Sequence, residues 1–416
     1  MRGAEVKQTT ASVSGACGGS ELAKHWGLDP GVDYLNHGSF GACPTVVLEA
    51  QARWQRRLER EPVLFMDREF EGLFDRAREA LAQFVGARSE DLAFVPNASA
   101  GVNTVLRSLR FEPGDEIVVT DQEYNATRNA VDFVAQRSGA RVVAVALPFP
   151  IAGPDVVVER VLAALTPRTK LLVLDHITSP TGLVLPIERL VREARERGVD
   201  TLVDGAHGPG HVALELEALG AAYYTGNCHK WMCTPKGSAL LHVRRDRQAL
   251  IRPLSISHGA NSRRTDRSLF RLEFDWPGTH DPSPWLVIPD AIEHIGALLP
   301  GGWSEVRRRN RELALWARDF VCSALGIPLP APASMIACLG AMPLPDRVGA
   351  ALEPSGHDPL HVALFQRHHI EIPVFAWPKP PRRLIRISAQ LYNRREQYQR
   401  LADVLRAELG LGGQIA

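Results

Sequence analysis

The sequence predicts an α/β protein built on a mainly parallel sheet, and three observations support this class. Seven short apolar runs, most of them rich in β-branched residues, lie between residues 91 and 243. Helical patterns separate most of these runs, and strands that alternate with helices indicate βαβ units with parallel strands. Longer helical patterns lie on both sides of this region. We therefore expect one large seven-stranded domain followed by a smaller one.

The expected elements can be placed along the chain. The seven expected strands cover residues 92–95, 117–120, 142–147, 171–175, 201–203, 222–225 and 239–243. Helices are expected among them at residues 102–109, 156–165 and 187–197, the last directly after Pro186, a favourable neighbour for a first helical turn. Long amphipathic helices are expected outside this region at residues 45–58, 68–84, 282–299 and 303–325.

The chain is expected to divide into a tail and two domains. Residues 1–25 are rich in Gly, Ser and Thr and lack an apolar signal core, so they predict a flexible tail. Residues 26–295 would form the large domain, including its N-terminal helical segment. Residues 296–416 would form a small α+β domain, with an apolar strand at 384–388 and a final helix near 396–409.

Composition excludes several classes of function. The 48 basic and 47 acidic residues give a net charge of +1, so no nucleic-acid surface is expected. No run of about 20 apolar residues exists, so no membrane span is expected. Six scattered cysteines predict no structural disulfides and fit a reducing cytoplasm. Only six lysines stand against 42 arginines, so a mechanism that needs a lysine has few candidates.

Ligands bind at the carboxyl ends of strands in open α/β sheets, so the residues after each strand are the candidates for a site. Pro96, Asn97, Ala98 and Ser99 follow the first strand and precede a helix. Small residues at a helix N-terminus expose backbone N–H groups that can bind phosphate. The alternative is a simple N-cap by Asn97 or Ser99, and both interpretations remain open. Neither of the glycine-rich phosphate-binding patterns, GxGxxG and GxxxxGK[ST], occurs in the sequence.

An acid and a lysine follow two later strands. Asp204 ends the fifth strand, where it either faces the ligand crevice or caps a turn. Lys230 follows the sixth strand with no acid within three positions, so it is either a surface lysine or a partly desolvated amine suited to Schiff-base formation. A phosphate site, a strand-end acid and a strand-end lysine together are the set that pyridoxal phosphate requires.

Six segments carry a resemblance to a known family. They are residues 34–41 (YLNHGSFG), 95–99 (VPNAS), 121–125 (DQEYN), 175–181 (DHITSPT), 204–207 (DGAH) and 224–231 (YTGNCHKW). With them the chain resembles the class V aminotransferases of pyridoxal-phosphate fold type I, and specifically the isopenicillin N epimerase-like branch, from about residue 30 to 400. The resemblance implies a seven-stranded, mainly parallel large domain, a small α+β C-terminal domain and pyridoxal 5′-phosphate as cofactor.

The resemblance also implies roles for the residues around the cofactor. Lys230 would carry the cofactor as a Schiff base and act as the catalytic residue. Asp204 would pair with the pyridinium nitrogen, and His207 would lie near the ring oxygen O3′. Ala98 and Ser99 would bind the phosphate through backbone N–H groups and a hydroxyl.

Further cofactor contacts are implied at five positions. Tyr124 would stack on the ring, as suits a flat electron-poor group. Thr225 and His229 would be further phosphate contacts. Gly278 and Thr279 match the family segment that reaches the phosphate of the partner subunit. The resemblance therefore implies a homodimer with shared active sites.

The resemblance implies three residues on the substrate side and one more cofactor contact. Arg386 matches the arginine that holds the substrate α-carboxylate, a task for which a bidentate guanidinium is suited. Asn36 and His37 would line the substrate side. Ser179 would contact a cofactor oxygen at a position where many class V members carry asparagine. Cysteine desulfurases carry a catalytic cysteine on a loop ahead of the substrate arginine, but residues 361–383 contain no cysteine. This difference counts against persulfide chemistry, though not against other C–S cleavage.

The reaction remains open among outcomes that share one first step. Lys230 would remove the α-proton of an amino-acid moiety. Return of a proton to the other face gives epimerisation, for which Tyr124 and His37 are the candidate acids. Loss of a β-substituent gives a C–S lyase acting on a cysteine conjugate, and return of the proton to the cofactor gives an aminotransferase. An inert relative used for binding is disfavoured, because it would not need both Lys230 and Asp204.

Two further features have alternatives. Cys228 and Cys233 flank Lys230, but their spacing is wrong for a zinc-binding CxxC pair, so no metal site is expected. The basic stretch at 252–271 is either a solvated loop or a loop that binds a second, distal carboxylate of the substrate. It contains Arg252, Arg263, Arg264, Arg267 and Arg271.

Overall fold

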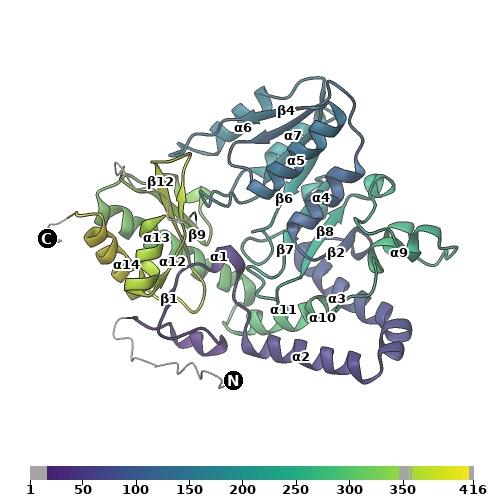
Figure 1. The fold of residues 1–416 in the computed structure, drawn as a ribbon, viewed down its shortest axis with the longest axis horizontal. Helices are drawn as coiled ribbons and strands as arrows, with labels where there is room; N and C mark the ends of the chain where they lie inside the picture. The colour runs from purple at the N-terminus through teal and green to yellow at the C-terminus, as the bar shows by residue number, and fades with distance from the viewer. Residues whose placement is uncertain (1–15, 346–355, 357, 412–416) are drawn as a thin grey trace, which may run out of the picture.

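The computed structural model describes residues 16–345, 356 and 358–411, and its central feature is a seven-stranded sheet (Figure 1). The strand order is β2-β8-β7-β6-β5-β3-β4, and β8 runs in the direction opposite to the other six strands of this sheet. The prediction of a mainly parallel α/β sheet is confirmed. The strands are β2 (Leu92–Val95), β3 (Glu116–Thr120), β4 (Arg141–Val145), β5 (Thr169–Asp175), β6 (Asp200–Asp204), β7 (Tyr223–Asn227) and β8 (Ala239–Val243).

Both faces of this sheet are covered, which explains why the strands read as continuous apolar runs. Alternate residues of β5 belong to different core clusters: Leu172 lies in one and Leu171 in the other. The first cluster includes side chains of α3 (Phe70–Val85), α6 (Pro154–Ala163) and α7 (Ile187–Glu196). The second includes side chains of α4 (Ala98–Ser108), α5 (Asn125–Ser138) and α9 (Leu269–Asp275). This arrangement leaves the strand ends as the place for a site.

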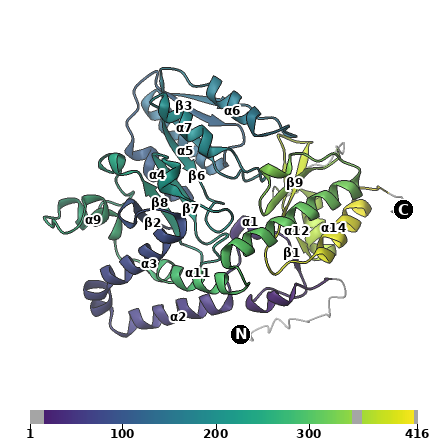
Figure 2. The same cartoon turned by 180° about the vertical axis from the view of Figure 1, so that it is seen from behind.

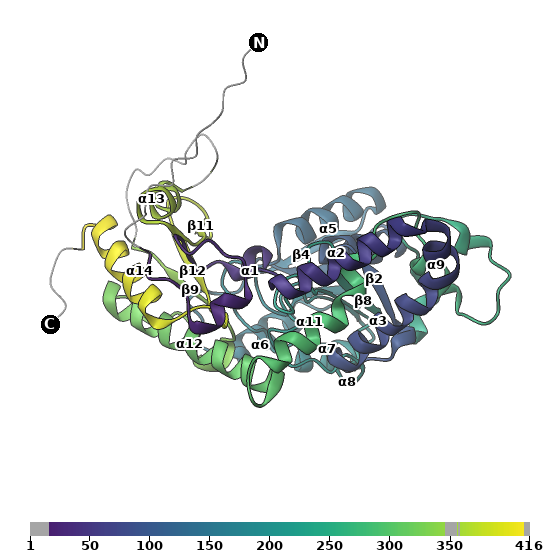
Figure 3. The same ribbon diagram turned by 90° about the horizontal axis from the view of Figure 1, so that it is seen from below.

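The helix predicted at 282–299 is two helices, α10 (Ser283–Leu286) and α11 (Ile288–Ala297). Pro289 lies in the first turn of α11, where its missing N–H costs nothing, but it cannot continue a preceding helix. The long helix α2 (Thr45–Arg60) contacts both α10 and α11, and Figure 3 shows α2 and α11 side by side.

A second sheet lies in the C-terminal region, with strand order β11-β12-β9 and antiparallel pairing throughout. Its elements are β9 (Leu339–Pro343), β11 (Val374–Ala376) and β12 (Arg383–Ser388). Figure 2 shows α12 (Gly302–Leu325) and α14 (Arg395–Glu408) against this sheet. Between them in sequence lies α13 (Pro359–His368). The structure thus has an α+β region where the sequence predicts one.

The N-terminal segment joins this small region. β1 (Asp33–Tyr34) pairs in parallel with β10 (Ile370–Glu371), and α1 (His37–Phe40) follows. Residues 1–15 of the predicted tail lie outside the described residues, and the short helix η1 (Glu21–His25) follows them. The predicted domain limits stay predictions.

Three shorter findings complete the fold. In the described part of the chain, no helix is long and apolar enough to cross a membrane. All six cysteines are free, as the sequence predicts. The other short helices are η2 (Leu64–Glu69), η3 (Ser89–Asp91), α8 (Leu216–Leu219), η4 (Arg245–Leu250), η5 (His258–Asn261) and η6 (Ala333–Met335).

Candidate active site

Lys230 lies three residues beyond β7, beside a histidine that follows β6. Its Nζ is 3.2 Å from Nε2 of His207, and the Trp231 indole N–H donates to Nδ1 of the same ring at 3.3 Å. Burial lowers the pKa of His207 well below its ordinary value, so the ring is neutral. With Nδ1 accepting from Trp231, the ring proton sits on Nε2 and points at the lysine nitrogen. This arrangement favours the uncharged amine that Schiff-base chemistry requires.

Electrostatics at Lys230 act in the same direction. Burial, and then the nearby Arg386 guanidinium, lower its pKa to about 8. The Asp204 carboxylate opposes this effect without cancelling it. Lys230 is therefore a better nucleophile and base near neutral pH than an ordinary surface lysine.

Asp204 ends β6 with both carboxylate oxygens engaged. The Thr127 hydroxyl donates to Oδ2 at 2.7 Å, and the Ala206 backbone N–H donates to Oδ1 at 3.0 Å. These two donors fix the plane of a carboxyl group that is only 2% exposed. Thr127 was missed by the sequence reasoning, although it follows the Tyr124 motif by one helical turn.

Two further acids surround Asp204 at the same edge of the sheet. Asp175 ends β5 opposite Asp204 in the strand register, and Glu123 follows β3. Carboxylate oxygens of the three acids lie within 4.8 Å of one another. Both oxygens of Glu123 and one of Asp175 are buried without a hydrogen-bond donor in the described chain. Burial and mutual repulsion raise the pKa of Glu123 and of Asp175 well above their ordinary values, so this cluster retains protons.

The helix start after β2 has the features of a phosphate site. Asn97 caps α4, its side chain accepting from Ala100 N–H at 2.8 Å. Ser99 lies in the first turn, where backbone N–H groups have no acceptor within the helix. The Ala98 N–H donates to Oδ1 of Asn227 at 2.8 Å. Asn227 is a second residue that the sequence reasoning missed, and it draws the end of β7 to the start of α4.

The two further phosphate contacts that the resemblance implies have different surroundings. The Thr225 hydroxyl is buried and donates to the Leu240 carbonyl at 2.9 Å. Gly101 lies directly over Thr225, because a Cβ there would come within 2.1 Å of the Thr225 hydroxyl. Nδ1 of His229 lies 2.9 Å from the Ser238 carbonyl, and burial lowers the pKa of His229 to about 4. Both roles stay predictions.

Arg386 of β12 brings a buried cation to the site. Its hydrogen-bond acceptors in the described chain are the carbonyl and hydroxyl of Ser179 and the hydroxyl of Ser39, and none of them is a carboxylate. Its Nε has no acceptor, and the guanidinium lies over the Phe375 ring at 5.3 Å. Burial lowers the pKa of Arg386 to about 10. Such a group favours an anionic ligand, because an uncompensated buried charge is costly.

Asn36 and His37 make hydrogen bonds to groups other than the Arg386 side chain. The Asn36 amide donates to Glu371 and its carbonyl oxygen accepts from Ser39. His37 is fully buried, with its ring nitrogens 2.8 Å from the Tyr392 hydroxyl and 3.0 Å from the Lys230 carbonyl. His37 therefore fixes the backbone at Lys230.

The remaining predicted residues lie at two places. Tyr124 caps the start of α5, is 43% exposed and is close enough to influence the pKa of Arg386. Gly278 and Thr279 line a cavity of about 510 Å³ with Pro96 and Ala100. They do not join the contacts of Lys230 within the described chain.

The basic stretch at 252–271 is largely neutralised by the protein itself. Arg267 and Arg271 both pair with Asp75 and with Asp275. The other partners are Glu273 for Arg252, and Glu71 and Asp266 for Arg264. The two interpretations from the sequence, a solvated loop and a loop that binds a distal carboxylate of the substrate, did not include these ion pairs.

These surroundings fit pyridoxal phosphate. A deprotonatable lysine, a fixed carboxylate at a strand end and a helix N-terminus converge at one edge of the sheet. The buried Arg386 lacks a carboxylate partner, and a substrate would supply one. Donors for a phosphate and a counter-charge for a carboxylate are thus both present.

The comparison with known families agrees with this geometry. The family model described as Aminotransferase class-V matches residues 43–401. This chain belongs to the class V aminotransferase family. The resemblance drawn from the sequence is therefore confirmed.

Individual relatives add detail. An isopenicillin N epimerase from Amycolatopsis lactamdurans is 38% identical over 393 residues, covering 91% of this chain and 96% of the relative. A probable chloroplastic L-cysteine desulfhydrase from Arabidopsis thaliana is 32% identical over 407 residues, covering 93% and 84%. The structure of a C-DES mutant with glycine covalently linked to its PLP cofactor aligns with a TM-score of 0.74 at 23% identity, covering 90% and 96%. That structural likeness confirms the predicted fold.

Proposed function

We propose that this chain is a pyridoxal-phosphate enzyme that acts at the α-carbon of an amino-acid moiety, as an amino-acid epimerase like isopenicillin N epimerase. One observation carries the proposal: an uncompensated buried arginine, Arg386, lies close enough to Lys230 to lower its pKa. An arginine that binds a carboxylate beside a basic lysine is the arrangement that α-proton removal from an amino acid requires.

Four residues would hold the cofactor in this proposal. When bound, pyridoxal 5′-phosphate supplies an electron-accepting ring that stabilises negative charge on the substrate α-carbon. Lys230 would attach it covalently, and Asp204 would keep its ring nitrogen protonated. The first turn of α4 at Ser99 and the side chain of Asn227 would bind its phosphate.

The protein residues would then handle the substrate. Arg386 would bind the α-carboxylate through its guanidinium, with Ser39 and Ser179 keeping it in place. Lys230, once free, would take the α-proton at Nζ, and His207 would hold that nitrogen in position. Epimerisation needs a second acid on the opposite face. Tyr124 is favoured over His37, because both nitrogens of His37 already have buried partners.

A C–S β-lyase acting on a cysteine conjugate is the second candidate. The similarity to the Arabidopsis thaliana protein named as a probable L-cysteine desulfhydrase favours it. The first steps would be the same, and the substrate would then lose its thiol instead of regaining a proton. An aminotransferase, which would return the proton to the cofactor, is the third outcome.

The reaction can be identified by incubating the purified holoenzyme with candidate amino acids and cysteine conjugates in D2O. Deuterium at the α-carbon with inverted configuration, measured by NMR and chiral chromatography, supports the epimerase. Release of pyruvate and a thiol would establish the lyase instead, and a keto acid with aminated cofactor would establish the aminotransferase. Failure of the protein to bind pyridoxal phosphate would contradict all three.

Assembly and location belong to the same proposal. Thr279 is exposed beside a cavity that reaches the start of α4, which suits a segment shared with a second copy of the chain. We infer a homodimer with shared active sites, testable by sedimentation and by mixing inactive variants. Six free cysteines support a reducing cytoplasm, where the enzyme would act in secondary metabolism such as antibiotic biosynthesis.

A further inference from the structure

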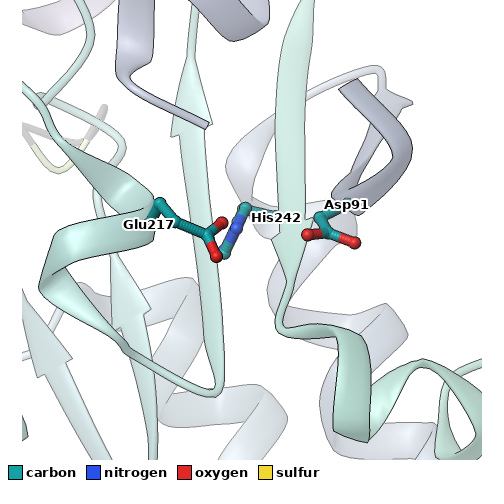
Figure 4. A group of neighbouring side chains, drawn as sticks. All are labelled: Asp91, Glu217 and His242. Carbon is teal, nitrogen blue, oxygen red and sulfur yellow. The ribbon is translucent and has the colours of Figure 1, made fainter. Parts of the chain in front are cut away.

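Three side chains that can bind a metal gather at the opposite edge of the large sheet from Lys230. Asp91 directly precedes β2, His242 lies near the end of the antiparallel β8, and Glu217 belongs to α8. His242 pairs with Leu92 at the start of β2, whereas the other end of β2 leads to the phosphate site. Figure 4 shows the imidazole between the two carboxylates.

His242 is the unusual member of this group. It is 2% exposed, and both ring nitrogens are buried without a hydrogen-bond partner in the described chain. A neutral imidazole carries one N–H donor and one acceptor, so every tautomer leaves two polar atoms unsatisfied. A buried polar group without a partner costs about 1–3 kcal/mol, and a ligand bound to this ring would remove that cost.

The spacing suits a single ion. One ligand atom from each of Asp91, Glu217 and His242 lies within 4.8 Å of the other two. A metal with bonds of about 2.1 Å would hold such atoms roughly 3–4 Å apart, a distance that small side-chain movements can reach. One imidazole nitrogen and two carboxylates form a ligand set that suits zinc or manganese.

Charge and access are also consistent with a cation. The carboxylates of Asp91 and Glu217 lie close together, and a cation between them would relieve their repulsion. The contacts already made to Asp91 come from the Gln248 amide at 2.7 Å and Arg88 at 3.8 Å, and they leave room for another ligand. Asp91 lines a cavity of about 580 Å³, and Glu217 is exposed, so an ion could reach the group from solvent.

We propose that Asp91, Glu217 and His242 bind one divalent transition-metal ion, with water completing its coordination. The site would fasten α8 to β2 and β8, three segments that are distant in sequence, and would stabilise the fold. It would take no part in the reaction, because it lies at the edge of the sheet opposite Lys230. The proposal departs from the expectation of no metal site, which concerned the cysteines and histidines near Lys230.

The test uses the holoenzyme stripped of metal with a chelator and titrated with Zn²⁺. We expect one Zn²⁺ per chain by calorimetry and a rise in the melting temperature, as for any ligand that binds only the folded state. Glu217→Gln should weaken Zn²⁺ binding by at least ~10-fold and abolish the rise. Glu90→Gln removes an exposed charge beside Asp91 without touching the group, and it should behave like the unchanged protein.

Two results would overturn the proposal. The first is a failure of Zn²⁺ to bind or stabilise the unchanged protein. The second is equal binding by Glu217→Gln, which would place the ion elsewhere. Co²⁺ provides an independent check, because its visible spectrum reports a nitrogen ligand. We expect that spectrum to be lost in His242→Gln, whose folding is verified by retained catalytic activity. If His242→Gln does not fold, the Co²⁺ spectra of the unchanged protein and Glu217→Gln decide instead, and identical spectra would also overturn the proposal.

Discussion

Buried charges at two places in the molecule differ in how they are paired. One place is the active-site edge of the sheet, and the other is an arginine network, formed by arginine and aspartate side chains of α3 and α9. In the network, Arg78 and Arg271 each pair with Asp75 and with Asp275. At the active-site edge, the Arg386 guanidinium has no carboxylate partner in the described chain. Paired charges hold a fold together, whereas unpaired buried charges are available to a ligand. This difference separates structural arginines from a functional one.

The largest effect is expected at Arg386. Replacing it with Gln removes the cation proposed to bind the substrate carboxylate, and such a loss costs about 2–5 kcal/mol of binding free energy. We expect kcat/KM to fall by at least ~30-fold with an unchanged or higher melting temperature, because an uncompensated buried charge has been removed. Unchanged kinetics would show that Arg386 is structural, like the arginines of the network.

The opposite outcome is expected at Asp75. Replacing it with Asn leaves Arg78, which is fully buried, with Asp275 as its one remaining carboxylate partner among the described residues. We expect a loss of about 2–4 kcal/mol in the free energy of unfolding, measured with urea. The folded variant should keep its kcat/KM, since the network lies outside the site. Loss of activity without loss of stability would contradict the comparison.

A smaller effect sharpens the comparison for acids. Burial raises the pKa of Glu123 in the folded protein well above its ordinary value of 4.5. Below pH 4.5 the carboxyl is protonated in both the folded and the unfolded chain, and its stabilising contribution is complete. As the pH rises from 4.5 toward the raised pKa, the unfolded chain loses the proton first, so this contribution is lost. Glu123→Gln should therefore flatten the decline in stability with rising pH, measured on cofactor-free protein by melting temperature. A parallel decline in both proteins would refute retained protonation.

The smallest effect is expected at the exposed end of the network. Arg263 is exposed, and Arg264 makes exposed ion pairs with Glu71 and Asp266. Such exposed pairs contribute little to stability, because water and salt screen them. Changing both arginines to Gln should leave KM for substrates with a distal carboxylate unchanged. A rise in KM limited to such substrates would instead support the interpretation of residues 252–271 as a loop that binds a distal carboxylate of the substrate.

The sequence predicted most of the fold but only part of the site. The strands were predictable because both faces of the sheet are buried, so each strand is a continuous apolar run. The break between α10 and α11 was missed, because the spacing of apolar residues does not reveal the interruption at Pro289. Thr127 and Asn227 were missed because their roles depend on contacts to Asp204 and Ala98, which are distant in sequence.

Charge pairing was the least predictable property. Asp75 and Arg267 are 192 positions apart, so nothing local in the basic stretch revealed its partners. Scarcity of lysine, in contrast, was a direct guide to Lys230. Lys236 is a useful control for it, because it lies nearby in the sequence, is exposed and donates to the Gly41 carbonyl at 2.7 Å.

The most direct test of the central claim is the visible spectrum of the purified protein with pyridoxal 5′-phosphate, in the unchanged chain and in Lys230→Ala and Lys236→Ala. The account predicts an absorbance band from covalently bound cofactor that borohydride reduction fixes to the peptide containing residue 230. The band should persist in Lys236→Ala and disappear in Lys230→Ala. A band that survives in Lys230→Ala, or modification at another lysine, would contradict the account.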